Sequence, residues 1–116
     1  MDDLVKAVLA FRDQRDWKQF HNPKDLAISI TLEAAELLEH FQWKTAGEVA
    51  AFVASEENRR CVGEEMADVL ILLISLGDVM GLDLLEAART KLRENARKYP
   101  VDRAKGNAKK YDELLP

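Results

Sequence analysis

The sequence predicts an all-α fold without a sheet, and three observations support this prediction. Apolar residues recur every three or four positions along most of the chain, which is the spacing of one helix face. No segment alternates apolar and polar residues with the period of two that a half-buried strand requires. Glycine and proline, which interrupt helices, number only five and three. The expected helices span approximately residues 2–16, 23–43, 45–54, 55–81 and 83–99.

The first two helices are defined by apolar spacing and by a capping signal. Apolar residues recur with helical spacing from Leu4 onward. Residues 17–21 form a connector that is unusually rich in aromatic side chains. Asn22 followed by Pro23 is typical of a helix start, because asparagine caps free backbone N–H groups and proline suits the first helical position. Asp25 in the first turn favours the same start through the helix dipole.

Capping residues also delimit the three helices that follow. Thr45 opens a capping-box pattern for the short helix, and Ser55 can cap the long helix after it. Gly81 is expected to end that long helix, because glycine readily takes the left-handed conformation found at helix C-termini. The last helix should begin at Asp83 and stop before Pro100, since the residue before a proline avoids helical geometry.

Length and composition indicate one small globular domain. The chain has 116 residues, of which 47% are hydrophobic and 33% charged, an ordinary balance for a protein that buries a core. We place the domain at residues 1–100 and interpret residues 101–116 as a polar C-terminal tail. A single helical layer of this size leaves much apolar surface uncovered, so the sequence favours a bundle that oligomerisation completes.

Composition also argues against several classes of protein. The single cysteine, Cys61, excludes an internal disulfide and a cysteine-rich zinc site. The longest uncharged run, residues 69–77, is too short to span a bilayer, so no membrane partner is expected. A net charge of −4 argues against duplex nucleic acid as a partner, because such binders normally have a basic face. The N-terminus has no signal-peptide pattern, so a cytoplasmic location is expected.

Two pairs of carboxylates lie where a helical protein normally places apolar residues. At about 100° per residue, Glu65 falls near the middle of the apolar face of its helix, and Asp68 lies about 60° away at the edge. Glu33 and Glu36 repeat this arrangement on the second helix. Residues at i and i+3 can converge on one ligand, and a buried carboxylate must be paired, protonated or metal-bound. We therefore interpret these four residues as candidate metal ligands.

The four candidate ligands favour Mg²⁺, with Mn²⁺ as a substitute, because all of them offer hard oxygen atoms. A di-iron bundle would require Glu-x-x-His on two helices, and His40 lies four positions after Glu36. An alternative needs no metal: Glu65 could pair with an arginine or lysine of another helix, while Glu33 and Glu36 flank the core. Four carboxylates need more positive charge than one side chain supplies, which favours the metal.

The order of these motifs resembles that of a known family. Glu33-Ala-Ala-Glu36 followed by Glu65-Met-Ala-Asp68 is similar to the ExxE…ExxD signature of the MazG-like, all-α nucleoside triphosphate pyrophosphohydrolases. The resemblance is closer still to the dCTP pyrophosphatase branch of that family. Further segments that resemble this branch extend the match over nearly the whole chain, and they are residues 15–21, 41–44, 95–100 and 106–111.

This resemblance implies a MazG-like four-helix-bundle core and a Mg²⁺-dependent house-cleaning enzyme. Its reaction would convert a (d)NTP to the (d)NMP and pyrophosphate, with a preference for dCTP. It also implies a homo-oligomer, either a dimer or a dimer of dimers. Glu33, Glu36, Glu65 and Asp68 match the family's metal-binding, catalytic positions. One departure is Leu32, where many members have a second glutamate, and it leaves open the number of metal ions and the group that orients the attacking water.

The resemblance also assigns residues to the nucleotide. Trp17 and Trp43 would flank the base by stacking, unless both anchor the core or a subunit interface. His21 lies in the loop near the expected pocket. The other substrate-binding candidates belong to the last helix and the tail, and they are Lys91, Asn95, Tyr99, Lys109 and Lys110. The simpler alternative for the lysines is a solvated surface position.

Two other functions fit the same residues. One is a less selective or dUTP-directed hydrolase with the same fold. The other is a non-catalytic helical interaction module whose acidic clusters hold a cation or pair with a basic partner. The tryptophan loop, together with Asn95 and Tyr99, favours the enzyme, because an interaction module has no need of base-stacking groups beside a metal site.

Overall fold

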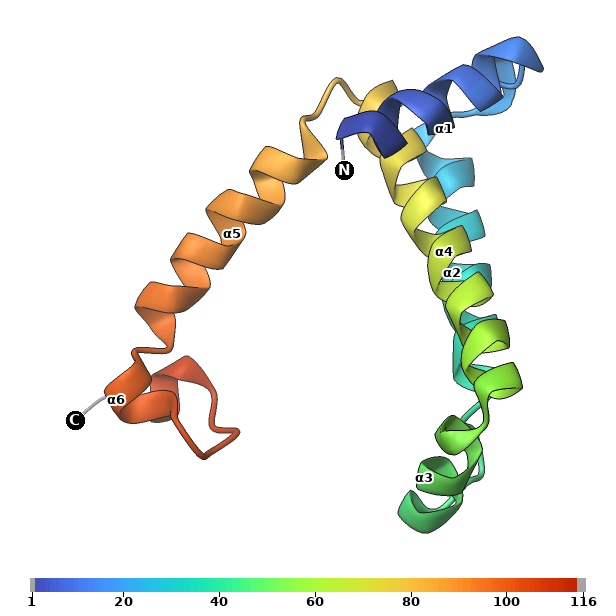
Figure 1. Cartoon of the computed structure of the whole chain (residues 1–116). Helices are drawn as coiled ribbons and strands as arrows, with labels where there is room; N and C mark the ends of the chain where they lie inside the picture. The colour runs from blue at the N-terminus through green and yellow to red at the C-terminus, as the bar shows by residue number, and fades with distance from the viewer. Residues whose placement is uncertain (1, 115–116) are drawn as a thin grey trace. The chain divides into compact units, whose positions relative to one another are not determined.

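The computed structural model describes residues 2–114, and over this range the chain is helical without a β-strand (Figure 1). The all-α prediction is therefore confirmed. The chain divides into two compact units, the N-terminal unit (Met1–Leu82) and the C-terminal unit (Asp83–Pro116). None of the described helices is long and apolar enough to cross a membrane.

Two antiparallel helices, α2 (Pro23–Glu39) and α4 (Glu56–Val79), form the centre of the N-terminal unit. The contacts between them are the most extensive between any two described elements. Both α1 (Asp2–Gln14) and α3 (Ala46–Ala54) also contact α4, and Figure 1 shows them at opposite ends of the α2/α4 pair. Because α2 and α4 are packed side by side, residues on their facing sides can share one site.

The predicted helix starts are confirmed by capping hydrogen bonds. The Asn22 side chain accepts a backbone N–H of the first turn of α2 at 2.9 Å. Thr45 and Glu48 complete the capping box of α3, since each side chain accepts the other residue's backbone N–H at 3.2 Å. The side chains of Ser55 and Asp83 cap α4 and α5 in the same manner. These local interactions give the helices their boundaries before any packing is considered.

The C-terminal end of α2 differs from the prediction, because the helix stops at Glu39 rather than near Trp43. The His40 N–H bonds back to the carbonyls of Leu37 and Leu38, which tightens the last turn. Trp43 then takes a left-handed backbone conformation, with a φ of 67°. This conformation redirects the chain at a helix end, and it is unfavourable for residues other than glycine. The Trp43 side chain is 91% exposed.

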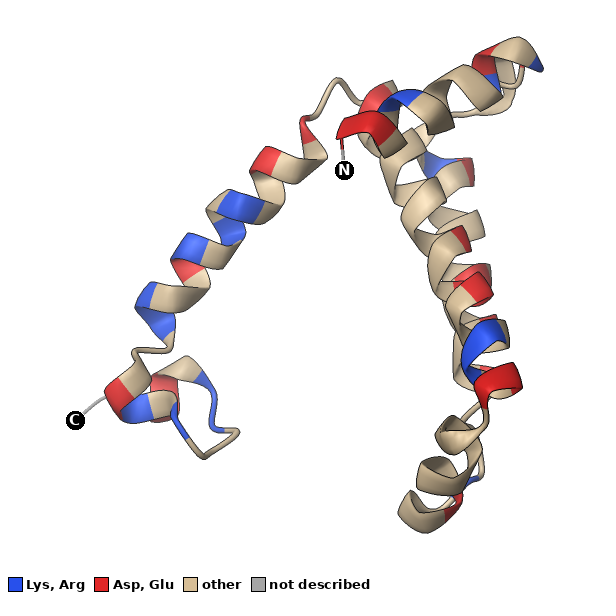
Figure 2. Cartoon of the chain, in the orientation of Figure 1, with Lys and Arg blue, Asp and Glu red and all other residues tan. Residues whose placement is uncertain are grey.

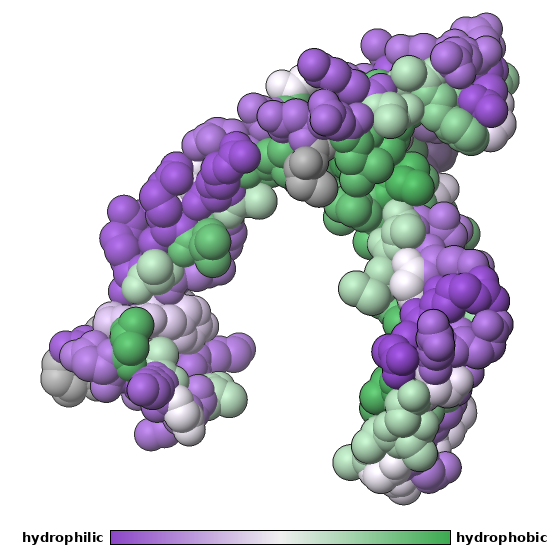
Figure 3. Space-filling model, in the orientation of Figure 1, coloured by the Kyte–Doolittle hydropathy of each residue, from purple (hydrophilic) through white to green (hydrophobic). Residues whose placement is uncertain are grey.

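The apolar core of the N-terminal unit is small. Its buried hydrophobic side chains are Val8, Leu26 and Ile74, one each from α1, α2 and α4. Figure 3 shows apolar side chains gathered over the upper part of α4, next to α1. The exposed large apolar residues of α2 and α4 include Ile28, Leu32, Leu38, Met66 and Ile71. An exposed apolar surface of this kind marks an interaction site.

The C-terminal unit contains two helices and a 3₁₀ turn, namely α5 (Leu84–Lys98), α6 (Val101–Ala104) and η2 (Tyr111–Glu113). Helix α5 ends before Pro100, as predicted. Within the unit Leu114 is buried, and the rings of Tyr99 and Tyr111 pack edge to face with centroids 6.5 Å apart. The segment expected to be a polar tail thus contains helical turns, and the division of the domain at residue 100 stays a prediction.

Candidate functional site

Three carboxylates converge where α2 packs against α4, and we call them the carboxylate cluster. Glu33 and Glu36 lie one turn apart on α2, and Glu65 lies on α4. One oxygen atom from each residue lies within 4.8 Å of the other two. Figure 2 shows acidic residues on both helices. Oxygens at this separation need only small side-chain rotations to contact one divalent cation.

The carboxylate cluster concentrates negative charge at a partly buried position, with Glu33 and Glu65 half-buried and Glu36 exposed. The pKa of Glu33 is raised above its ordinary value by desolvation and by the charge of Glu36. The pKa of Glu65 is also raised, by desolvation and by its contact with Glu36. The Oε2 atom of Glu33 is buried without a hydrogen-bond partner within the described chain. A hard divalent ion would satisfy that oxygen and offset the repulsion, so the residues present fit Mg²⁺ or Mn²⁺.

Asp68 lies beside the carboxylate cluster. It follows Glu65 by one turn of α4 and is exposed. Its charge contributes to the raised pKa of Glu33, so the two residues are close. Within residues 2–114 none of these four carboxylates forms an ion pair with a lysine or arginine. The pairing of Glu65 with an arginine or lysine of another helix is therefore not seen in this range.

His40 adjoins the carboxylate cluster, a position that the motifs did not predict. Its Nε2 atom lies 3.7 Å from Oε1 of Glu65. Its ring packs against Phe52 of α3 with a centroid distance of 6.1 Å. The available signal was the i, i+4 spacing of Glu36 and His40, which places both near one face of the helix end. His40 thus links the cluster to the packing of α3.

An apolar cavity of about 330 Å³ lies among α1, α4 and the loop that carries the 3₁₀ turn η1 (Lys18–Phe20). Trp17 and Phe11 line it and contact each other edge to face, with ring centroids 5.7 Å apart. His21 and Ser75 contribute polar groups to its wall. Aromatic walls with a few polar groups are typical of a pocket for a small ring-containing ligand.

The apolar cavity and the carboxylate cluster both include residues of α4. Leu72 lines the cavity and follows Glu65 of the cluster by seven residues, which is about two helical turns or about 10 Å along the axis, with Asp68 between them. Side chains four residues apart share one face of a helix. A ligand with an aromatic ring in the cavity and an anionic group on a cluster-bound cation would span this distance.

The two tryptophans lie beyond opposite ends of α2. Trp17 precedes the helix and Trp43 follows it, and a helix of 17 residues is about 25 Å long. Only Trp17 lines the apolar cavity. The two side chains of one chain therefore cannot flank the same base, and a stacking role for both requires Trp43 of a second copy.

The remaining predicted substrate residues belong to the C-terminal unit. Asn95 is half-buried on α5, and the Lys91 ammonium lies 3.6 Å from a carboxylate oxygen of Glu94. Tyr99 follows the end of α5 and donates its backbone N–H to the Asn95 carbonyl at 2.8 Å. Lys109 and Lys110 are exposed and directly precede η2.

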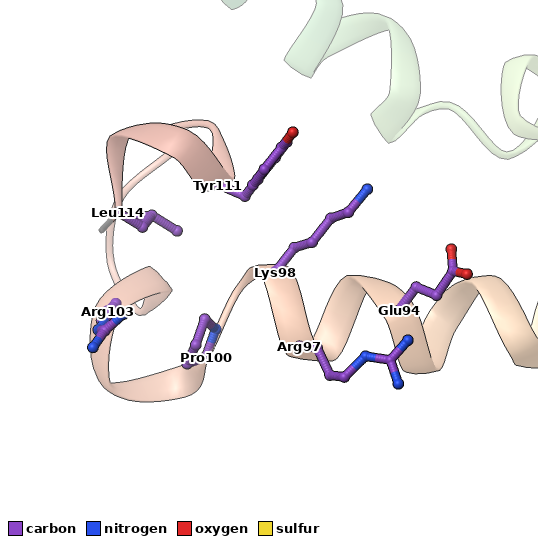
Figure 4. A pocket seen from close by; sticks show the side chains of 7 residues that line it. All are labelled: Glu94, Arg97, Lys98, Pro100, Arg103, Tyr111 and Leu114. Atoms are coloured by element: carbon purple, nitrogen blue, oxygen red, sulfur yellow. The ribbon is translucent and has the colours of Figure 1, made fainter. Parts of the chain in front are cut away.

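The C-terminal unit also has its own cavity, of about 490 Å³ (Figure 4). Lys98 and Tyr111 extend to the same side of it, and the Lys98 ammonium lies 5.0 Å from the Tyr111 ring centroid. Arg97 and Arg103 also line this cavity. None of the residues predicted to bind substrate lines it, so we treat it as a separate feature of the unit.

The fold and the site define a class of all-α protein whose central helix pair carries facing carboxylates beside an aromatic cavity. The sequence profile of the MazG-like family matches residues 28–114. The chain belongs to the MazG-like family.

Similar proteins extend this match over most of the chain. It is 39% identical to human dCTP pyrophosphatase 1 and 37% identical to the bovine protein of that name. These alignments cover 98% of this chain and 67% and 68% of the relatives. A crystal structure of a pyrophosphatase from Archaeoglobus fulgidus superposes with a TM-score of 0.75 at 45% identity, covering 86% of this chain and 92% of that one.

Proposed function

We propose that this chain is a Mg²⁺-dependent nucleoside triphosphate pyrophosphohydrolase that converts a (d)NTP to the (d)NMP and pyrophosphate. The observation that carries this proposal is the carboxylate cluster about two helical turns along α4 from the apolar cavity. The relatives named dCTP pyrophosphatase 1 support dCTP as the preferred substrate. Removal of unwanted nucleotides from the cytoplasmic pool is the role that fits this activity.

The carboxylates supply the metal site in this proposal. Glu33, Glu36 and Glu65 would hold Mg²⁺ or Mn²⁺, with Asp68 beside them. When bound, such an ion neutralises phosphate oxygens and lowers the pKa of a coordinated water. The protein's part is to position the triphosphate and the attacking water in line. Because Leu32 offers no ligand atom, we assign the orientation of that water to a carboxylate oxygen of the cluster.

The apolar cavity would receive the base. Trp17 offers a ring face for stacking, which tolerates any base, and the apolar walls exclude water from the nucleotide. His21 is the loop residue placed to contact the base edge. We assign the second stacking surface to Trp43 of another copy, because its side chain is exposed and lies beyond the far end of α2.

The C-terminal unit would complete the substrate contacts, with residues 1–100 as the catalytic domain and 101–116 as a tail. Asn95 and Tyr99 are assigned to the base or sugar, and basic side chains to the phosphates. Those basic residues are Lys91, Lys109 and Lys110. A homo-oligomer, as a dimer or a dimer of dimers, would bring Trp43 of one copy to the cavity of another.

The test is a panel of NTPs and dNTPs incubated with Mg²⁺ and scored for monophosphate and pyrophosphate. We expect dCTP to be the best substrate, with activity lost in EDTA and restored by Mg²⁺ or Mn²⁺. Undiminished turnover in chelator would rule out the metal site. A preference for dUTP would support the proposed reaction but contradict cytosine as the preferred base. If no nucleotide is hydrolysed, the function that fits the site is a cation-binding interaction module.

Glu65→Gln tests the cluster itself. Loss of a residue that hydrogen-bonds to a metal ligand typically reduces activity by roughly 10- to 100-fold. Loss of a ligand itself should therefore reduce kcat/KM by more than about 100-fold. The metal-free variant should melt no lower than the wild type, because one repelling charge is gone. Glu64→Gln, on the exposed side of the same helix, is the matched control and should retain activity. A clear drop in the melting temperature of metal-free Glu65→Gln would indicate a broken ion pair instead.

A further inference from the structure

Arg12 is a charged residue buried in the N-terminal unit. Its side chain is 4% exposed. Its Nη1 donates to Oδ2 of Asp78 on α4 at 2.7 Å, and its Nε donates to Oδ1 of Asp13 at 2.9 Å. The guanidinium thus joins α1 to α4, and the same residue lines the apolar cavity. A buried charge of this kind is tolerated only with its partners in place.

His21 lines the same cavity as Arg12, and the positive charge of Arg12 acts on its ring. The Nδ1 atom is buried without a hydrogen-bond partner in the described structure, whereas the residue as a whole is only half-buried. The accessible part of the ring is therefore the edge that carries Nε2. Burial and the charge of Arg12 lower the pKa of His21, so the ring is neutral near pH 7 and carries one proton.

The guanidinium determines which ring nitrogen carries that proton. An N–H at Nδ1 would be a buried donor without an acceptor, in surroundings that the charge of Arg12 makes positive. A proton on Nε2 instead leaves a lone pair at the buried Nδ1, which a nearby positive charge favours, and presents an N–H donor at the accessible edge. The charged groups around His21 are Arg12 together with its partners Asp13 and Asp78.

We propose that Arg12, held by Asp78, is a positioning residue that keeps His21 as an Nε2–H donor in the cavity and so selects cytosine over uracil and thymine. This rests on the proposed function, in which the cavity holds the base. Cytosine presents two adjacent acceptors, O2 and N3. O2 accepts in all three bases, so the choice is made at N3. Uracil and thymine carry a proton on N3, which would oppose a His21 donor placed against this atom, and a buried donor without an acceptor is strongly disfavoured.

The experiment compares the wild type with Arg12→Met/Asp78→Asn, which removes both charges of the buried pair. Arg12→Lys retains the positive charge, and Asp13→Asn is the matched control at the exposed partner. Imidazole ¹⁵N NMR reports the tautomer of His21, which His21→Phe distinguishes from His40, the other histidine of the chain. The second measurement is the ratio of kcat/KM for dCTP to that for dUTP.

We expect an Nε2–H tautomer in the wild type, Arg12→Lys and Asp13→Asn, and a mixture of tautomers in the double variant. The dCTP-to-dUTP ratio should fall by roughly tenfold in the double variant and in His21→Phe, because both lose the oriented donor. An Nδ1–H tautomer in the wild type would overturn the proposal. An unchanged dCTP-to-dUTP ratio in His21→Phe would also overturn the proposal. This measurement tests the proposal even if the double variant does not fold.

These outcomes separate this inference from the proposed function. A wild type that hydrolyses no nucleotide contradicts the proposed function, while the NMR spectra still test whether Arg12 controls the His21 tautomer. A change in tautomer without a change in the ratio would show that Arg12 controls the His21 tautomer but that the base is read elsewhere, and it would overturn the proposed selectivity.

Discussion

At the scale of single residues, the chemistry of the site depends on carboxylates whose pKa values are raised by their surroundings. Glu33 has a buried oxygen without a partner, and the pKa values of Glu33 and Glu65 are both raised. Such groups lower the stability of the metal-free fold and gain most from a bound cation. The same residues therefore connect stability to metal binding.

This connection predicts the pH dependence of the metal-free protein. Because the pKa of Glu33 is higher in the folded than in the unfolded chain, the folded state binds more protons in the window above its ordinary value of 4.5. The free energy of unfolding should therefore fall as the pH rises through that window toward 7, and this contribution should be recovered on acidification. Urea unfolding in EDTA between pH 4.5 and 7 measures it.

Glu33→Gln is the variant that isolates this contribution. Its unfolding free energy should fall less steeply over the same window, and added Mg²⁺ should stabilise the wild type at pH 7 far more than the variant. Glu39→Gln, at the end of the same helix and outside the cluster, should behave as the wild type. An identical pH slope in Glu33→Gln and the wild type would contradict the role of the cluster.

At the scale of secondary structure elements, the turn after α2 is one of two places in the described part of the N-terminal unit where a residue other than glycine has a positive φ, the other being Asp16. Trp43 adopts a positive φ of 67° that glycine takes without penalty. Its side chain is almost fully exposed, so packing within the chain does not offset that strain. A strained, exposed aromatic residue is more readily explained by a function than by stability.

A comparison of two substitutions separates backbone strain from the loss of the side chain. Trp43→Gly and Trp43→Ala both remove the ring, but only glycine relieves the left-handed conformation. We expect the glycine variant to be more stable than the alanine variant by about 1 kcal/mol in urea unfolding. Both should raise KM for every nucleotide by a similar factor, because stacking does not distinguish bases. Equal stability of the two variants would show that the turn is not strained.

At the scale of the whole molecule, the exposed apolar surface of α2 and α4 predicts that the protein assembles with a second copy of itself. On α2, Ile28 and Leu32 are separated by one turn and are 48% and 60% exposed. At about 100° per residue, Ile28 lies about 140° and Leu32 about 100° around the helix from Glu33. Burial of such a surface against a second copy would stabilise both chains.

We expect multi-angle light scattering at micromolar concentration to show a dimer or a tetramer. Leu32→Lys places a charge in the exposed apolar surface of α2 and should shift the protein toward the monomer, because burying an unpaired ammonium group is unfavourable. The control is Gln14→Lys at the end of α1, which makes the same charge change at an exposed polar position. A monomeric wild type would exclude assembly through this surface.

Much of the architecture is determined by the sequence alone. The caps at Asn22, Thr45, Ser55 and Asp83 are confirmed, because a capping hydrogen bond joins residues within one turn and needs no distant partner. The i, i+3 spacing of the carboxylates on α2 and α4 is likewise a property of each helix by itself. The end of α2 was predicted wrongly, since the left-handed turn at Trp43 has no glycine to signal it.

Only the tertiary structure decides which helix faces meet. The packing of α2 against α4 brings Glu33 and Glu36 to Glu65 and adds His40, whereas the length of α2 separates Trp17 from Trp43. The pair of Arg12 and Asp78 is equally invisible in the sequence, because 66 residues separate its members. Helical periodicity reports which face of a helix is buried, but the partner of that face depends on packing between segments far apart in the chain.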